Sequence, residues 1–266
     1  MSNHIKVVIL CGGKGTRLQE ETEYRPKPMV EIGEKPILWH IMKIYSHYGF
    51  NQFILCLGYK GDMIKNYFYA YDILNKDFSI ELGSNRKRIE IHNADKEENW
   101  RVTLADTGQK TLKGARIKRV EKYLEGDLFM LTYGDGLANI DLPQLFSFHK
   151  SHGRIGTVTG VRPPSRFGEL AVKDRQVISF VEKPQVSEGL INGGFFVFNH
   201  SFLNYLSEDD ECDFEVGPLE RLAEDDELMV YEHKGDWACM DTYRDMVYLN
   251  ELWNSRKAFW KIWDER

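Results

Sequence analysis

A glycine-rich turn follows the first apolar run of the chain. Residues 7–10 read VVIL, which predicts a buried strand, and the letters CGGKGT come next. Gly12, Gly13 and Gly15 leave much of this backbone bare, so the turn can close on a triphosphate. Its N–H groups and the Thr16 hydroxyl would then donate hydrogen bonds to the phosphate oxygens.

Two better-known phosphate-binding motifs do not match this turn. A Walker A loop requires Lys followed directly by Ser or Thr, but here Gly15 follows Lys14. The dinucleotide-binding fingerprint requires a third glycine three positions on, where Leu18 stands instead. A turn adapted to a nucleoside triphosphate is the interpretation that fits.

Two cations stand close to the turn. Arg17 follows it directly, and Lys27 lies between Pro26 and Pro28. The prolines restrict the backbone on both sides, so the Lys27 ammonium is presented from a stiff segment. A preorganised charge stabilises a reacting phosphate without reorganising during the reaction. The alternative is an ordinary glycine turn beside a solvated lysine.

Two aspartates could hold a divalent metal ion, which prefers carboxylate oxygens on rigid backbone. Asp135 follows the apolar run LFMLTY, and ligands of open α/β sheets bind at the carboxyl ends of strands. Asp241 stands far away in the letters ACMDTYRD. The structural alternatives are a turn residue for Asp135 and a helix N-cap for Asp241.

A third group of polar residues lies in the second half of the chain. Glu182 and Lys183 are adjacent, so in a strand their side chains face opposite sides. Asn192 carries an amide that can donate to and accept from hydroxyls, and Gly193 allows close approach. Gly168 lies in the letters RFGEL. The alternative for the Glu-Lys pair is two charges at a strand end before a proline.

The elements that must position these residues follow a recognisable order. Over residues 1–154 apolar runs alternate with amphipathic stretches, which predicts a parallel sheet with helices on both faces. A charged, β-leaning excursion interrupts this core at residues 76–122. Residues 155–200 predict short antiparallel strands, and residues 201–266 return to helical spacing. We therefore expect one domain over residues 1–266.

Composition narrows the function further. The chain has 266 residues, 42% hydrophobic and 29% charged, which suits a globular protein with a full core. Its net charge of −6 argues against non-specific nucleic-acid binding. The four cysteines lie far apart without metal or redox spacing, which favours a reducing, cytoplasmic compartment. No apolar run is long enough to predict a signal peptide or membrane span.

The motifs GGKGTRL, PKPMVEIGEKPIL, YGDG, EKP, INGGFFV and MDTYRD, in this order, resemble the sugar-1-phosphate nucleotidyltransferases over nearly the whole chain. The resemblance implies an α/β, Rossmann-like three-layer fold with a mixed, mostly parallel central sheet. A small antiparallel sugar-binding region and a helical C-terminal tail complete the implied fold. The letters LWHIMKIYSHYG and TYGDGLANID are most similar to members that use CTP and glucose 1-phosphate. These members release pyrophosphate and make CDP-glucose, a precursor of deoxysugars and O-antigen polysaccharide.

The resemblance also implies a role for each candidate residue. The implied catalytic residues are Arg17, Lys27, Asp135, Lys183 and Asp241. The implied nucleotide contacts are Leu10, Cys11, Gly12, Gly13, Lys14, Gly15, Thr16, Arg17, Lys27, Thr111, Arg116 and Gly134. The implied sugar-phosphate contacts are Gly168, Glu182, Lys183, Asn192 and Gly193. Asp135 and Asp241 would share one Mg²⁺.

Some alternatives stay open from the residues alone. The stretch around Thr111 and Arg116 could be a basic solvated loop. The same reaction could use another nucleoside triphosphate or another phosphorylated substrate, because no motif reads the base directly. A catalytically silent, nucleotide-binding regulatory subunit is a different class of protein on the same fold. The family also implies a homo-oligomer, to which the aromatic C-terminal tail could contribute.

Overall fold

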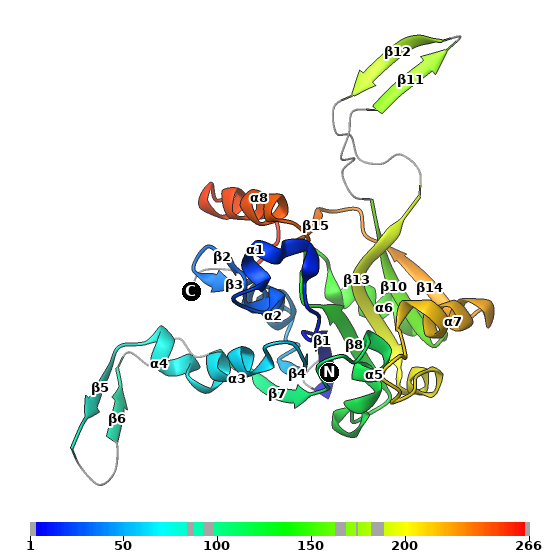
Figure 1. The fold of residues 1–266 in the computed structure, drawn as a ribbon. Coiled ribbons are helices and arrows are strands. Elements are labelled where there is room, and N and C mark those ends of the chain that lie inside the picture. The colour runs from blue at the N-terminus through cyan, green and yellow to red at the C-terminus, as the bar shows by residue number, and fades with distance from the viewer. Residues whose placement is uncertain are drawn as a thin grey trace.

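The structure is a computed structural model, and it describes residues 4–83, 88–92, 98–162, 169–173, 175–181 and 189–263. A seven-stranded sheet forms its centre (Figure 1). The strands, in spatial order, are β14 (Leu228–Glu232), β10 (Gly156–Val161), β13 (Ile191–Asn199), β8 (Leu128–Tyr133), β1 (Lys6–Leu10), β4 (Gln52–Leu57) and β7 (Arg101–Asp106). Within this sheet β13 alone runs antiparallel to its neighbours. The sheet is therefore mixed and mostly parallel, as the family resemblance implies.

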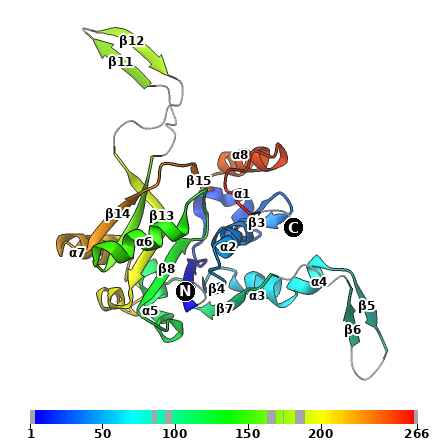
Figure 2. The ribbon, with the colours of Figure 1, turned by 180° about the vertical axis from the view of Figure 1, so that it is seen from behind.

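Side-chain alternation along the central strand produces the three layers. Val7 and Ile9 belong to one buried cluster, and Val8 and Leu10 belong to the other. Helices α2 (Ile37–His47), α3 (Gly61–Tyr69) and α6 (Leu142–His152) contribute to the first cluster. Helices α5 (Lys113–Arg119) and α7 (Glu220–Glu224) contribute to the second (Figure 2). Burial of apolar side chains on both faces holds the sheet between its helices.

The C-terminal tail packs onto the first cluster. Trp260 is completely buried, and its indole nitrogen donates to His40 Nδ1 at 3.3 Å. The ring of Trp253, at the end of α8 (Tyr243–Asn254), lies 4.7 Å from the His40 ring. The other ring nitrogen of His40 bonds to the Ile32 carbonyl oxygen at 2.9 Å. The aromatic residues of the tail are thus core residues of their own chain.

Two hairpins project from the body of the molecule (Figures 1 and 2). One is formed by β5 (Phe78–Glu81) and β6 (Arg88–Ile91), beyond helix α4 (Tyr71–Asn75). The other is formed by β11 (Glu169–Lys173) and β12 (Gln176–Val181). The predicted 76–122 excursion therefore has two parts, because β7 and α5 belong to the core while the first hairpin projects.

The remaining short elements surround the carboxyl end of the sheet. They are α1 (Gln19–Thr22), the pair β2 (Glu31–Ile32) and β3 (Lys35–Pro36), and the pair β9 (Gly136–Ala138) and β15 (Trp237–Cys239). The C-terminal portion thus carries strands β14 and β15 as well as helices. None of the helices in the described part of the chain has the length and apolar character needed to cross a bilayer.

Candidate active site

A different feature of the structure explains each glycine of the first turn. Gly15 has a φ of +63°, in the left-handed region that favours glycine. A Cβ added to Gly12 would lie 2.2 Å from a guanidinium nitrogen of Arg116, so close packing excludes any side chain there. A Cβ added to Gly13 would meet no atom within 4 Å. At this position the bare backbone faces open space, which is what a bound phosphate would require.

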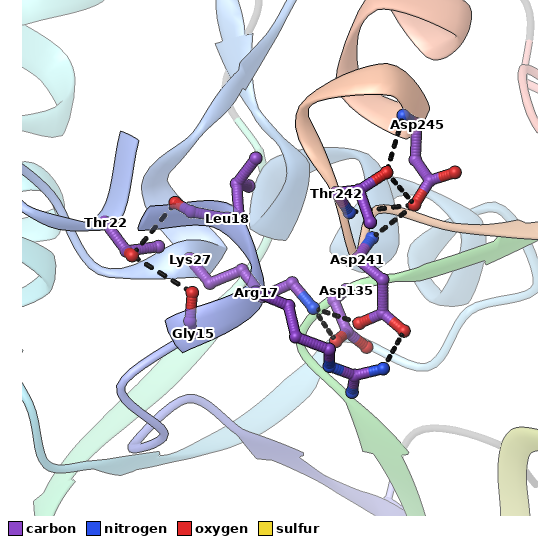
Figure 3. Close-up of polar contacts among 9 residues, drawn as sticks. All are labelled: Gly15, Arg17, Leu18, Thr22, Lys27, Asp135, Asp241, Thr242 and Asp245. Carbon is purple, nitrogen blue, oxygen red and sulfur yellow. Dashed lines mark hydrogen bonds and ion pairs between the residues drawn. The ribbon is translucent and has the colours of Figure 1, made fainter. Parts of the chain in front are cut away.

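Four charged side chains converge beside this turn (Figure 3). The Lys27 ammonium donates to Asp135 Oδ2 and to Asp241 Oδ1, both at 2.6 Å. Arg17 donates to the other oxygen of Asp241 at 2.7 Å. The structure therefore brings together the two cations and the two carboxylates that the sequence singled out separately.

Short strands bring the two aspartates together. Asp135 lies between β8 and β9, at the carboxyl end of a central strand. Strand β15 pairs antiparallel with β9, and the Met240 N–H donates to the Asp135 carbonyl oxygen at 2.9 Å. Asp241 follows directly, so the β9–β15 pair carries it to the side of Asp135. Both positions are thus held by backbone hydrogen bonds.

The start of α8 leaves the Asp241 carboxylate available for cations. Thr242, not Asp241, is the N-cap, and its hydroxyl accepts a hydrogen bond from the Asp245 N–H. Asp245 in turn accepts from the Thr242 N–H at 2.8 Å and from the Asp241 N–H at 3.1 Å. This is a capping box, which satisfies the free N–H groups of the first turn. The N-cap alternative for Asp241 is therefore wrong.

The electrostatics keep Lys27 charged. Its side chain is 12% exposed, and burial by itself lowers the pKa of an ammonium. The charges and hydrogen bonds of Asp135 and Asp241 outweigh that burial, so the pKa of Lys27 lies above its usual value of 10.5. A protonated Lys27 can neutralise a phosphate at physiological pH.

The donor set fits one divalent cation with few protein ligands. Asp135 and Asp241 already direct one oxygen each at a single cation, the Lys27 ammonium, which stands in for the charge of a metal. Across the described residues, no group of three or more His, Cys, Asp or Glu side chains is arranged to hold a metal ion. Mg²⁺ suits such a place, because it is commonly held by one or two carboxylates together with substrate phosphates and water.

These charges line one wall of a cavity of about 900 Å³. Most of the predicted site residues also line it: Leu10, Cys11, Gly12, Gly13, Gly15, Thr16, Thr111, Arg116, Gly134, Asn192 and Gly193. Lys14 is not among the lining residues. The predicted residues Gly168, Glu182 and Lys183 lie outside the described residues.

Thr111 and Arg116 line the cavity, and most of their side-chain polar atoms already form hydrogen bonds within the protein. Arg116 is 3% exposed and donates to the carbonyl oxygens of Gly12, Leu57 and Gly108 and to the Thr107 hydroxyl. The Thr111 hydroxyl donates to Asp210 at 2.6 Å and accepts from Arg119 at 2.8 Å. Arg116 therefore supports the glycine-rich turn through Gly12, and this stretch is not a solvated loop.

Among the lining residues that were not predicted as site residues, four carry a side-chain nitrogen or oxygen: Lys113, Tyr133, Glu215 and Trp237. Tyr133 stands directly before the Gly-Asp pair, so its position could have been a signal. Lys113 lies close to Thr111, which is a weaker signal. Trp237 directly precedes the letters ACMDTYRD, which is also a weak signal. Glu215 comes from a segment without any recognisable motif, and only the fold brings it to the cavity.

Comparison with known proteins identifies the family of this chain. Residues 6–254 match the nucleotidyl transferase family. The chain is 50% identical to the glucose-1-phosphate cytidylyltransferase of Salmonella typhimurium, over 98% of this chain and 100% of that one. It is 46% identical to the probable glucose-1-phosphate cytidylyltransferase of Bacillus subtilis, over 97% of this chain and 100% of that one. The chain belongs to the nucleotidyl transferase family, which confirms the resemblance.

Solved structures share the architecture. HddC from Yersinia pseudotuberculosis, solved in complex with GMP-PN, has a TM-score of 0.65 at 25% identity and covers 94% of this chain and 99% of its own. A UDP-glucose pyrophosphorylase complexed with UDP-glucose has a TM-score of 0.67 at 16% identity and covers 95% and 99%. The second likeness concerns the fold alone. The predicted α/β fold class is confirmed.

Proposed function

We infer that this protein is an enzyme that joins CTP and α-D-glucose 1-phosphate, giving CDP-glucose and pyrophosphate. The observation that carries this inference is the Lys27 ammonium held between Asp135 and Asp241 in the wall of a large cavity. The choice of cytosine and glucose is supported by the relatives named glucose-1-phosphate cytidylyltransferase, at 46% and 50% identity over nearly full length.

The reaction is an in-line displacement at phosphorus. An oxygen of the sugar phosphate attacks the α-phosphorus of CTP and forms a new P–O bond. The bond between the α-phosphorus and the oxygen leading to the β-phosphate breaks, and its electron pair leaves with pyrophosphate. Both reactants are anions, so the site must hold them together and neutralise their charge. No covalent enzyme intermediate is required.

Different residues of this chain would bind the triphosphate and the sugar phosphate. We assign the triphosphate to Arg17, Lys27 and the N–H groups around Gly13, where the backbone faces open space. When the triphosphate binds, both cations exchange a carboxylate partner for phosphate oxygens. For the sugar phosphate we assign Asn192 and the backbone of Gly193, which line the same cavity. Lys183, Glu182 and Gly168 keep the roles that the family resemblance implies.

Asp135 and Asp241 would hold Mg²⁺, as their convergence on one cation suggests. When bound, this ion supplies neutralisation of the charge that grows on the α-phosphate and the departing pyrophosphate. Lys27 would then act from the phosphate side of the two carboxylates.

A cytoplasmic homo-oligomer in deoxysugar or O-antigen precursor synthesis is the cellular setting we propose. The projecting β5–β6 hairpin supports self-association. Phe78 faces Ile91 and Ile80 faces Ile89 across the hairpin, so these apolar side chains share one face. Each is at least 36% exposed within the single chain. An isolated amphipathic hairpin of this kind is stabilised when a partner covers its apolar face.

A substrate screen tests the proposed reaction. Pyrophosphate release is measured with each of ATP, CTP, GTP, UTP and dTTP against glucose, mannose and galactose 1-phosphates, with Mg²⁺. We expect CTP with glucose 1-phosphate to give the highest kcat/KM by at least about tenfold. A higher value for another pair would overturn the substrate assignment. Binding of CTP without pyrophosphate release from any pair would instead indicate the silent regulatory subunit.

A further inference from the structure

A chain of hydrogen bonds connects two walls of the cavity. Asn192 Nδ2 donates to the Tyr133 hydroxyl at 3.0 Å, and that hydroxyl donates to Glu215 Oε1 at 2.7 Å. Lys113 also donates to Glu215 Oε1, at 2.5 Å. These residues come from β13, β8, α5 and the segment before α7, and all four line the cavity.

The Glu215 carboxylate, at one end of this series of hydrogen bonds, determines which atom donates in each of them. Glu215 Oε1 accepts from both Lys113 and the Tyr133 hydroxyl, so the Tyr133 proton points towards it. The Tyr133 oxygen is then an acceptor for Asn192 Nδ2. At the other end, the Gly194 N–H donates to Asn192 Oδ1 at 2.9 Å. The Asn192 amide is therefore held in one orientation by a donor on one side and an acceptor on the other.

The hydrogen-bonding groups of the Asn192 amide that remain unused within the chain match a sugar hydroxyl. A side-chain amide has two donor hydrogens and two acceptor lone pairs. Tyr133 takes one hydrogen and Gly194 takes one lone pair, so one donor and one acceptor remain. Asn192 is exposed and lines the cavity, so these two are available to a ligand. A hydroxyl group both donates and accepts, and is the complementary partner.

Packing holds Tyr133 in this arrangement. Its ring lies against the backbone at Gly194, where φ is +82° and an added Cβ would be 2.7 Å from the ring. The ring also meets Phe196 edge-on, with centroids 5.7 Å apart. Within the described residues Glu215 Oε2 is buried without a hydrogen-bond partner, a cost in stability that is typical of functional sites.

We propose that Tyr133 and Glu215 are positioning residues that orient the Asn192 amide towards a hydroxyl of the hexose. The inference rests on the proposed function, because it assigns this wall of the cavity to the sugar phosphate. Neither residue needs to touch the reacting phosphorus. Both determine sugar affinity through Asn192.

The test compares Tyr133→Phe with Tyr205→Phe. Both variants remove a phenol that donates to a carboxylate, but Tyr205 donates to Asp225 at 2.7 Å and does not line the cavity. For Tyr133→Phe we expect the KM for glucose 1-phosphate to rise about fivefold or more, with the KM for CTP unchanged. Tyr205→Phe should change neither. Glu215→Gln keeps an acceptor but no longer dictates the proton direction, so its KM should lie between wild type and Tyr133→Phe.

A double-mutant cycle shows whether Tyr133 affects the KM for glucose 1-phosphate through Asn192. If Tyr133 acts through Asn192, adding Tyr133→Phe to Asn192→Ala should raise the KM for glucose 1-phosphate no further. Additive effects in the cycle, equal rises for both substrates, or an unchanged KM in Tyr133→Phe would each overturn the positioning role. Wild-type protein that releases no pyrophosphate from CTP and glucose 1-phosphate would refute the proposed function instead, so the two failures are distinguishable.

Discussion

Arg17 and Asp241 are in direct contact although 224 positions separate them, with the guanidinium nitrogen 2.7 Å from the carboxylate oxygen. The other oxygen of Asp241 accepts from Lys27 at 2.6 Å. One carboxylate thus engages both cations that the proposed function assigns to the triphosphate. Binding of substrate must exchange these partners, and the first two predictions follow from that exchange.

Lys27→Met removes the charge and keeps most of the side-chain length. We expect turnover to fall about 100-fold or more, because a preorganised charge at the reacting phosphate is lost. Steady-state pyrophosphate release measures this, and Lys65→Met, on the exposed side of α3, is the matched control. Near-normal turnover in Lys27→Met would show that its role is misassigned.

Removal of divalent metal should abolish turnover and leave the fold in place. Asp135→Asn would weaken one of the two carboxylates that we propose as metal ligands, so half-maximal activity should require about tenfold more Mg²⁺ or higher still. Titration of activity against Mg²⁺ concentration measures the shift. Activity that persists in excess chelator, or an unchanged Mg²⁺ dependence in Asp135→Asn, would contradict the assignment.

Acid should destabilise the protein through His40. Burial lowers the pKa of His40 from 6.5 to about 4, because the charged ring is disfavoured beside Trp260. The unfolded chain therefore takes up the proton first. The stability contributed by neutral His40 is complete above about pH 6.5 and declines as the pH falls towards about 4. The Tm of His40→Gln should fall less steeply over this range than that of wild type.

His149 provides the comparison for that experiment. Burial lowers its pKa to about 4 as well, so it contributes to the acid slope of both proteins. Only the difference between wild type and His40→Gln reports on His40. Parallel slopes in the two proteins would rule out the His40 contribution.

Arg116→Met should cost both stability and nucleotide affinity. The change removes four hydrogen bonds beneath the turn. The Gly12 and Leu57 carbonyl oxygens keep a backbone N–H donor, whereas the partly buried Gly108 carbonyl oxygen loses the guanidinium that donates to it. We expect the free energy of unfolding to fall by about 2–4 kcal/mol. The KM for CTP should rise because Gly12 loses its support. Chemical denaturation and steady-state kinetics measure the two effects, and Arg221→Met, at an exposed arginine, is the control. A stable variant with normal kinetics would show that Arg116 does not hold the turn.

The β5–β6 hairpin should control the oligomeric state. Ile80→Asp places a charge on its apolar face, whereas Ser79→Asp places the same charge on the opposite face. Light scattering after size exclusion should show a smaller assembly for Ile80→Asp and an unchanged one for Ser79→Asp. Equal masses for both variants would mean that this face is not an interface.

Local signals in the sequence predicted much of the fold. The apolar run of β1, the glycines after it and the prolines around Lys27 act through neighbours in the chain, so their consequences can be read directly. The order of apolar runs predicted a parallel sheet with helices on both faces, and the family resemblance implied that this sheet is mixed. The separation of the β5–β6 hairpin from β7 could not be read, because pairing of β7 with β4 is a contact between distant segments.

The sequence by itself determined the kinds of group in the site: a bare turn, two cations, two carboxylates and an amide. Only the tertiary structure decided that β15 carries Asp241 to Asp135 and that Lys27 lies between them. It also decided that Glu215 meets Tyr133. Such contacts depend on strand pairing and packing across more than 80 positions of chain, and no local pattern of residues encodes them.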